Sequence, residues 1–260
     1  MSWVLANLGL IADRAWSHLG LAVPAIAASF LIALPIGWLA QRFRWSRTTL
    51  LAATGLLYAI PSLPLFVLLP GLLGTAVRDR LNVVAALTLY GVALMARSVA
   101  DALAAVDSGA TQAATAVGYD RWRRFWQVEL PLAGPVLLAG LRVVAVSTIS
   151  LVTVSAVLGV PSLGLLFTDG FQRGIIAEVL AGIVATVLLA LVVDGLLVLA
   201  GRLAMPWTRA LPRPQTVLPE AATGIPSPMP SPGSAIRPAP TARTASGPGW
   251  ANTWPTAWWR

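Results

Sequence analysis

Long apolar stretches dominate this sequence and restrict the folds open to it. The hydrocarbon core of a bilayer is about 30 Å thick, and an α-helix crosses it with about 20 residues. Five stretches reach that length: Leu19–Ala40, Leu50–Leu69, Leu81–Ala100, Val136–Leu158 and Ile175–Ala200. Charged residues make up only 11% of the chain, against roughly 25% in soluble domains. We therefore predict an all-α fold, a polytopic membrane helix bundle with about five transmembrane helices.

The composition excludes several classes of site. The chain has no cysteine and one histidine, His18, and its eighteen basic residues are all arginine. Thiolate and histidine metal centres lack their ligands, so we expect no metal site and no catalytic residue. A net charge of +8 can indicate nucleic-acid binding, but these arginines punctuate apolar runs and form no basic face. We therefore expect a lipid membrane as partner and no nucleic acid.

Arginines predict the orientation of the bundle. Ten lie at the end of, or after, the first, third and fifth stretches: Arg42, Arg44, Arg47, Arg97, Arg121, Arg123, Arg124, Arg202, Arg209 and Arg213. Four lie on the opposite side: Arg14, Arg78, Arg80 and Arg173. Because positive segments stay in the cytoplasm, the N-terminus is predicted outside, and the C-terminus and the linker 101–130 inside. We expect an interfacial arm over residues 1–18 and a transmembrane domain over 19–205.

The chain changes character from residue 206. Eleven of its twenty prolines lie between Pro212 and Pro255, mixed with Ser, Thr, Ala and Gly. Such a composition buries too little apolar surface to order itself, so residues 206–260 are predicted to form a disordered cytoplasmic tail. Contact of the closing tryptophans with the membrane interface is the alternative.

The linker 101–130 carries signals for two short helices. Asp107 or Ser108 can cap a helix over Ala110–Val117, and Gly118 supplies a left-handed stop. Asp120 can cap a second helix.

Aromatic residues Trp122, Phe125 and Trp126 share one face of that second helix, and Pro131 is expected to limit it. The pair of helices suits docking into a groove of a partner protein. It equally suits a helix lying on the lipid surface.

Three runs in and after the linker carry a family signature: Val106–Gly118, Val128–Pro131 and Ala139–Arg142. They resemble the coupling loop of importer permeases of the ATP-binding cassette class, which has Glu-Ala-Ala, then Gly, then a hydrophobic–Leu-Pro ending. Gln112 stands here where the family usually has glutamate. We assign coupling to an ATPase to these positions: Gln112, Ala113, Ala114, Gly118, Trp122, Leu130 and Pro131.

Further runs sharpen the resemblance. Ala59–Phe66, Val128–Ala133 and Leu158–Leu165 look like those of osmoprotectant permeases for glycine betaine, carnitine, choline or proline. The resemblance implies a permease subunit of an ATP-driven importer in the bacterial plasma (inner) membrane, working by alternating access. An amino-acid importer permease of the methionine type and a non-transporting membrane scaffold subunit are the alternatives.

The same resemblance implies separate partner chains. These are a pair of cytosolic ATP-binding subunits, a second permease subunit (the same or a homologue) and an extracytoplasmic substrate-binding protein. The chain itself has no glycine-rich phosphate loop and no lysine. We therefore expect no enzyme activity and no cofactor in this chain, with ATP and Mg on the partner ATPase.

Prolines interrupt the second apolar stretch. Discontinuous helices often line transport pathways, and we assign a gate or pathway role to Ile60, Pro61, Ser62 and Pro64. A structural kink is the alternative. Hydroxyl residues Ser147, Ser150 and Ser155 in the fourth stretch could also line the pathway, or else mediate close helix packing.

Two charges lie inside the predicted spans at matching depth. Arg142 and Asp194 are expected to form an interhelical ion pair, since intramembrane charges need partners. Pairing of Arg142 with Asp101 and snorkelling of Arg142 to the headgroups are the alternatives. His18 is expected at the interface and Glu178 in solvent. The segment Gly159–Gly174 could form a re-entrant gate or a docking surface.

Overall fold

The computed structural model describes residues 2–42 and 44–207, and within these ranges it contains helices and no strand. The helices follow this order: α1 Ser2–Ala6, α2 Leu8–Arg42, α3 Arg44–Ala59, α4 Ser62–Leu73, α5 Arg80–Ala104, α6 Ser108–Ala116, α7 Arg121–Arg124, α8 Leu130–Val152, α9 Gly164–Arg173 and α10 Ile176–Ala204. A π-helical turn η1, Phe125–Glu129, joins α7 to α8, and a 3₁₀ helix η2, Thr153–Leu158, extends α8. All but the first two residues of the predicted tail lie outside the described residues.

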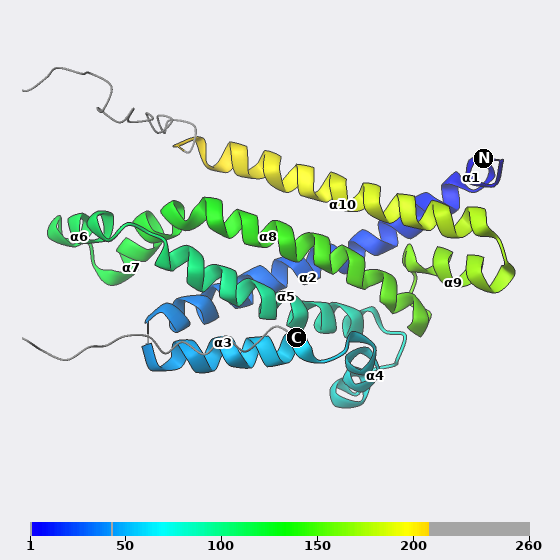
Figure 1. Cartoon of the computed structure of the whole chain (residues 1–260), viewed down its shortest axis with the longest axis horizontal. Coiled ribbons are helices and arrows are strands. Elements are labelled where there is room, and N and C mark those ends of the chain that lie inside the picture. The colour runs from blue at the N-terminus through cyan, green and yellow to red at the C-terminus, as the bar shows by residue number, and fades with distance from the viewer. Residues whose placement is uncertain (1, 43, 208–260) are drawn as a thin grey trace, which may run out of the picture. The chain divides into compact units, whose positions relative to one another are not determined.

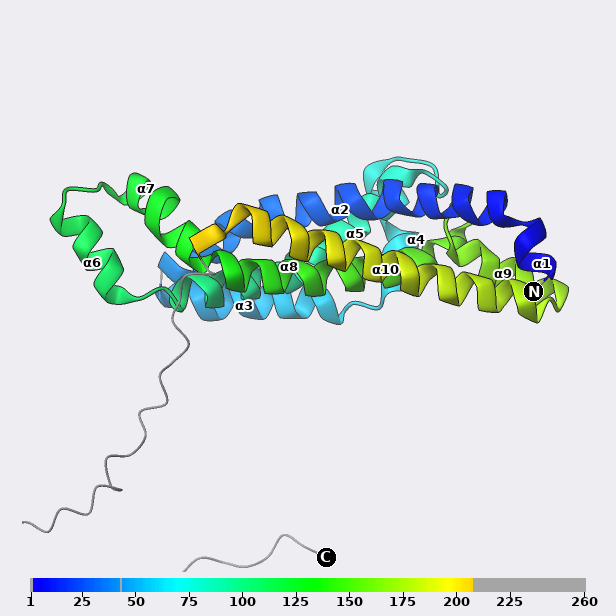
Figure 2. The ribbon, with the colours of Figure 1, turned by 90° about the horizontal axis from the view of Figure 1, so that it is seen from above.

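The long helices lie side by side, and the short ones gather at the two ends of the bundle. Both views place α6 and α7 beyond one end and α1 and α9 at the other (Figures 1 and 2). The C-terminal end of α10 lies at the end that carries α6 and α7 (Figure 1). Helix α1 and the linker helices therefore lie at opposite ends of the bundle.

Four helical segments are long and apolar enough to cross a bilayer: α2, α5, the continuous run 121–158, and α10. The second predicted span differs, because α3 and α4 meet at an angle of 100°. Pro61 precedes α4 in an extended conformation, has no N–H to give, and disfavours helical dihedrals at Ile60. The predicted span over Leu50–Leu69 is therefore a broken one, and the break falls at the prolines that were expected to interrupt it.

Helix α5 forms the centre of the bundle, and small residues let α2 approach it closely. A Cβ placed on Gly91 would lie 2.6 Å from the Cβ of Ser29, and one on Gly37 would lie 2.5 Å from the Cβ of Val99. Ser29 donates to the carbonyls of Ala25 on its own helix and Thr88 on α5, at 2.6 and 3.2 Å. Backbone approach and an interhelical hydrogen bond thus replace the hydrophobic driving force that is missing inside a membrane.

His18 is not exposed at the surface of the bundle, because α2 begins at Leu8 and carries it inside, where it is fully buried. Its Nε2 lies 3.0 Å from the carbonyl oxygen of Ile149 on α8. There α8 tightens into η2, and the N–H of Thr153 points to the carbonyls of Ser150 and Leu151 instead. The carbonyl of Ile149 has lost its helical donor, and His18 supplies one in the tautomer that carries the proton on Nε2.

Gly91→Ala tests the close contact between α2 and α5. We expect a loss of about 1–3 kcal/mol of stability, because the added methyl overlaps Ser29. The matched control is Gly55→Ala on α3, where nothing lies within 4 Å of the new Cβ. That change should be neutral or raise stability by up to about 1 kcal/mol through helix propensity. The apparent melting temperature of the detergent-solubilised protein measures both, and equal shifts would contradict the packing argument.

Candidate coupling surface and intramembrane sites

The first linker helix forms as its sequence signals indicate. Asp107 caps α6 by accepting a hydrogen bond from the N–H of Ala110 at 3.1 Å. The helix ends at Ala116, and Gly118 takes a φ of +92°, the left-handed region that favours glycine. One side chain, that of Asp107, and one glycine, Gly118, thus set the two ends of α6.

The second linker helix begins as predicted but does not stop. Asp120 accepts from the N–H of Arg123 at 3.0 Å, and α7 then continues through η1 into α8. The expectation that Pro131 limits this helix is wrong, because Pro131 lies in the first turn of α8. In η1 the N–H of Leu130 donates to the carbonyl of Phe125, a π-type bond. Such a wide turn leaves one carbonyl without a donor, and a residue without an N–H fits there.

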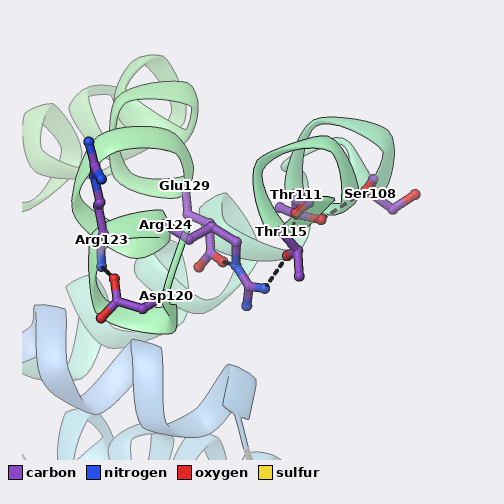
Figure 3. Close-up of polar contacts among 7 residues, drawn as sticks. All are labelled: Ser108, Thr111, Thr115, Asp120, Arg123, Arg124 and Glu129. Carbon is purple, nitrogen blue, oxygen red and sulfur yellow. Dashed lines mark hydrogen bonds and ion pairs between the residues drawn. The ribbon is translucent and has the colours of Figure 1, made fainter. Parts of the chain in front are cut away.

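One arginine joins α6 to the start of α8. Arg124 donates from Nε to the carboxylate of Glu129 at 2.8 Å and from Nη1 to the hydroxyl of Thr115 at 3.0 Å. Figure 3 shows the guanidinium between these two side chains, which come from α6 and from η1. The side chains of Arg124 and Glu129 are largely shielded from solvent. Because α6 is short and contains no buried residue, this network is its main polar tie to the bundle.

The aromatic residues of the linker divide between the core and the surface. The rings of Trp122, Phe125 and Trp126 contact one another at centroid distances of 5.3–6.3 Å. Phe125 is buried and meets the ring of Trp38 on α2 edge-on at 6.1 Å, whereas Trp122 and Trp126 stay exposed. The three rings cluster as predicted, but only the two tryptophans are free to meet a partner or lipid.

The predicted coupling residues form an exposed set and a supporting set. Gln112, Ala113, Gly118 and Trp122 are exposed, at the end of the molecule where α6 and α7 project (Figure 2). The half-buried residues are Ala114, Leu130 and Pro131. A cavity of about 760 Å³ lies between α6 and the ends of α2 and α5, and Gln112, Thr115 and Arg121 contribute to its wall.

The predicted gate lies at the break between α3 and α4. Ile60, Pro61 and Pro64 are exposed there and Ser62 is half-buried. The hydroxyl of Tyr90 on α5 donates to the carbonyl of Ile60, which the break has left without a helical partner. We did not predict this role for Tyr90; a tyrosine within a helix of mostly small and aliphatic residues was the signal that could have found it.

The three predicted pathway serines do not share a surface. Ser155 is fully buried in η2 and donates to the carbonyl of Val152 at 2.7 Å, whereas Ser150 is exposed. Ser147 lines a groove between α8 and α10. In an uninterrupted α-helix Ser155 would share a face with Ser147, but the chain passes to about three residues per turn at Thr153, which rotates Ser155 away.

Arg142 and Asp194 meet across α8 and α10. The guanidinium donates from Nε and Nη2 to the two carboxylate oxygens at 2.6 and 2.7 Å. Asp101, the alternative partner, instead lies 3.4 Å from Arg47 of α3.

The end of the bundle that carries α1 and α9 is packed more tightly than expected. The segment Gly159–Gly174 contains α9, whose Gly170 leaves room for Val179 of α10. Glu178 is buried, contrary to the expectation of a solvated side chain, and Arg173 lies 3.7 Å from its carboxylate.

Comparison with known proteins identifies a matching family and similar sequences. The profile of the family described as "Binding-protein-dependent transport system inner membrane component" matches residues 19–203. The osmoprotectant import permease protein OsmW of Salmonella typhimurium is 34% identical over 75% of this chain and 92% of its own length. The choline transport system permease protein OpuBB of Bacillus subtilis is 24% identical over 78% of this chain and 92% of its own length.

Solved structures share the fold. An inward-facing structure of the MetNI methionine ABC transporter superposes with a TM-score of 0.64 at 22% identity, covering 80% of this chain and 99% of the other. An amino acid ABC transporter crystallised with histidines gives 0.60 at 17% identity, over 80% and 97%.

Arg124→Gln tests whether the arginine holds α6 in place. We expect amide hydrogen exchange in α6 to accelerate about fivefold, because losing charge-assisted hydrogen bonds on a partly exposed surface costs about 1 kcal/mol. Arg121→Gln is the matched control, since Arg121 makes no ion pair among the described residues. Equal exchange in the two variants would show that α6 is held by other contacts.

Proposed function

Because this chain belongs to the family of binding-protein-dependent transport system inner membrane components, we propose that it is the permease subunit of an ATP-driven importer of osmoprotectants. Glycine betaine, choline, carnitine and proline are the candidate solutes. The observation that carries the solute class is 34% identity to an osmoprotectant import permease over 92% of that protein. The likeness to methionine and amino acid transporters lies below 25% identity and bears on the fold alone.

The linker geometry supports a coupling role for α6 and α7. Their exposed surface, with Gln112, Ala113, Gly118 and Trp122, projects from the bundle, where a cytosolic ATPase subunit can bind. Arg124 and Phe125 connect this surface to α8 and α2. Closure of an ATPase pair on nucleotide would push α6, and these contacts would pass the displacement to the spans. ATP and Mg would belong to the ATPase, which hydrolyses the nucleotide.

The remaining partners follow from the same proposal. A second permease subunit, the same chain or a homologue, would complete the pathway, and an extracytoplasmic binding protein would deliver the solute. The break at Ile60–Pro64 would act as the gate, because its dihedrals and its single hydroxyl contact from Tyr90 can change without unfolding α3 or α4.

Transport of an osmoprotectant is tested by uptake. In an osmosensitive host without importers of its own, the chain with its ATPase and binding protein should accumulate radiolabelled glycine betaine. Ala114→Glu and Gly118→Trp should abolish both uptake and recovery of the ATPase with the permease, because they alter the coupling surface. Gln172→Trp, at the opposite end, should leave ATPase recovery unchanged. Uptake of methionine in place of betaine would support an amino-acid importer, and a complex without ATPase would support a scaffold.

Orientation is tested by cysteine labelling, since the chain has no cysteine of its own. A Ser108→Cys variant should react with a membrane-impermeant thiol reagent only from the cytoplasmic side. A Gln172→Cys variant, at the other end, should react only from outside. The reverse pattern would place the linker 101–130 outside and overturn the assignment of the cytoplasmic end.

A further inference from the structure

The Arg142–Asp194 pair lies in an open groove and not in a sealed contact. The groove runs between α8 and α10, and its volume is about 680 Å³. Its walls are mostly aliphatic: Ala139, Val143, Val146, Ser147, Val187, Ala190 and Leu191. Two formal charges and one hydroxyl therefore face a space otherwise lined by methyl groups.

The pair leaves part of the guanidinium unused. Asp194 accepts from Nε and from Nη2, which engages two of the five N–H donors of Arg142. Nη1 has no acceptor among the residues that the structure describes, and 42% of the arginine side chain remains exposed. Asp194 therefore fixes the plane of the guanidinium while its far edge still offers donors to the groove.

Depth in the membrane limits what can occupy the groove. Arg142 lies in the continuous helical run 121–158, which is long and apolar enough to cross a bilayer, and charges inside such a span face protein or water, because hydrocarbon offers them no partner. An occupant that suits the groove has an acceptor for the free edge of Arg142. It also needs no net charge, since the pair itself is neutral.

We propose that this groove is a binding site for a zwitterionic solute that carries a carboxylate and a quaternary ammonium group. The solute carboxylate accepts from the free edge of Arg142, as planar guanidinium groups suit carboxylates. Its ammonium group, which has methyl groups and no N–H, lies among the valine side chains with the carboxylate of Asp194 nearby. This assignment rests on the proposed function and adds the residues that meet the solute within the membrane.

The site distinguishes solutes by their carboxylate. Glycine betaine has both groups, whereas choline has the ammonium group and a hydroxyl in place of the carboxylate. Arg142 can form a charge-assisted hydrogen bond only with the carboxylate of glycine betaine. The site should therefore prefer zwitterions over the corresponding cations. An ion pair that only holds α8 to α10 predicts no such preference.

Protection of a cysteine in the groove tests the site directly. A Ser147→Cys variant, assembled with its ATPase subunits and binding protein in proteoliposomes, is treated with an anionic water-soluble thiol reagent. Glycine betaine should slow labelling and choline should not. Arg142→Gln in the same background should raise the betaine concentration for half protection by about tenfold or more, since a charge-assisted hydrogen bond is lost. Arg142→Lys, which keeps the charge, should recover part of the protection.

Two controls separate binding from structure. An Ala104→Cys variant at the end of α5 should be labelled with or without betaine. The double variant Arg142→Gln with Asp194→Asn keeps a neutral hydrogen-bonded pair, so it should still recover the ATPase but lose protection by betaine.

Three results would overturn the site: no labelling of the Ser147→Cys variant, equal protection by betaine and choline, or protection unchanged by Arg142→Gln. If the wild type takes up betaine while any of these holds, only this inference fails. If the wild type takes up none of glycine betaine, choline, carnitine and proline, the proposed function fails.

Discussion

Inside a bilayer every backbone carbonyl that leaves its helix must find a donor within the protein, and the bundle is arranged around this requirement. Helices are interrupted at two places within the membrane, after Ala59 and at Thr153. In each case another helix supplies a side-chain donor: Tyr90 reaches the carbonyl of Ile60, and His18 reaches that of Ile149. The irregular segments are therefore defined features, fixed to α5 and α2 by single hydrogen bonds.

Close packing and coupling depend on the same central helix. Gly91 and Ser29 bring α5 against α2, and the C-terminal end of α5 leads directly into α6. The other end of the linker passes through η1 into α8, which packs on α5 as well. A displacement of α6 is therefore passed to two adjoining helices, α5 and α8. Arg124 holds α6 to the segment that leads into α8.

Features encoded within a few residues could be predicted from the sequence, and those that depend on distant partners could not. The spans, the caps at Asp107 and Asp120 and the stop at Gly118 follow from local composition and spacing. The Arg142–Asp194 contact could be predicted, because two opposite charges at the same predicted depth have few other possible partners. The burial of His18 and the shifted face of Ser155 could not be predicted. Both depend on where α8 changes to a 3₁₀ helix, and no residue of the sequence signals that position.

The π-helical turn lets the chain carry one more residue between the coupling helices and α8 without turning them apart. A π turn closes with one residue more than an α turn, so the extra residue widens the turn and leaves α7 and α8 nearly in phase. Deleting one residue from Phe125–Glu129 and closing the turn to an α-helix would therefore leave the direction of α7 nearly unchanged. The deletion would instead disturb the contacts made at this turn, where Phe125 packs on Trp38 and Glu129 accepts from Arg124. The length of this five-residue segment thus decides which side chains tie the coupling helices to the bundle, independently of the chemistry of the exposed surface.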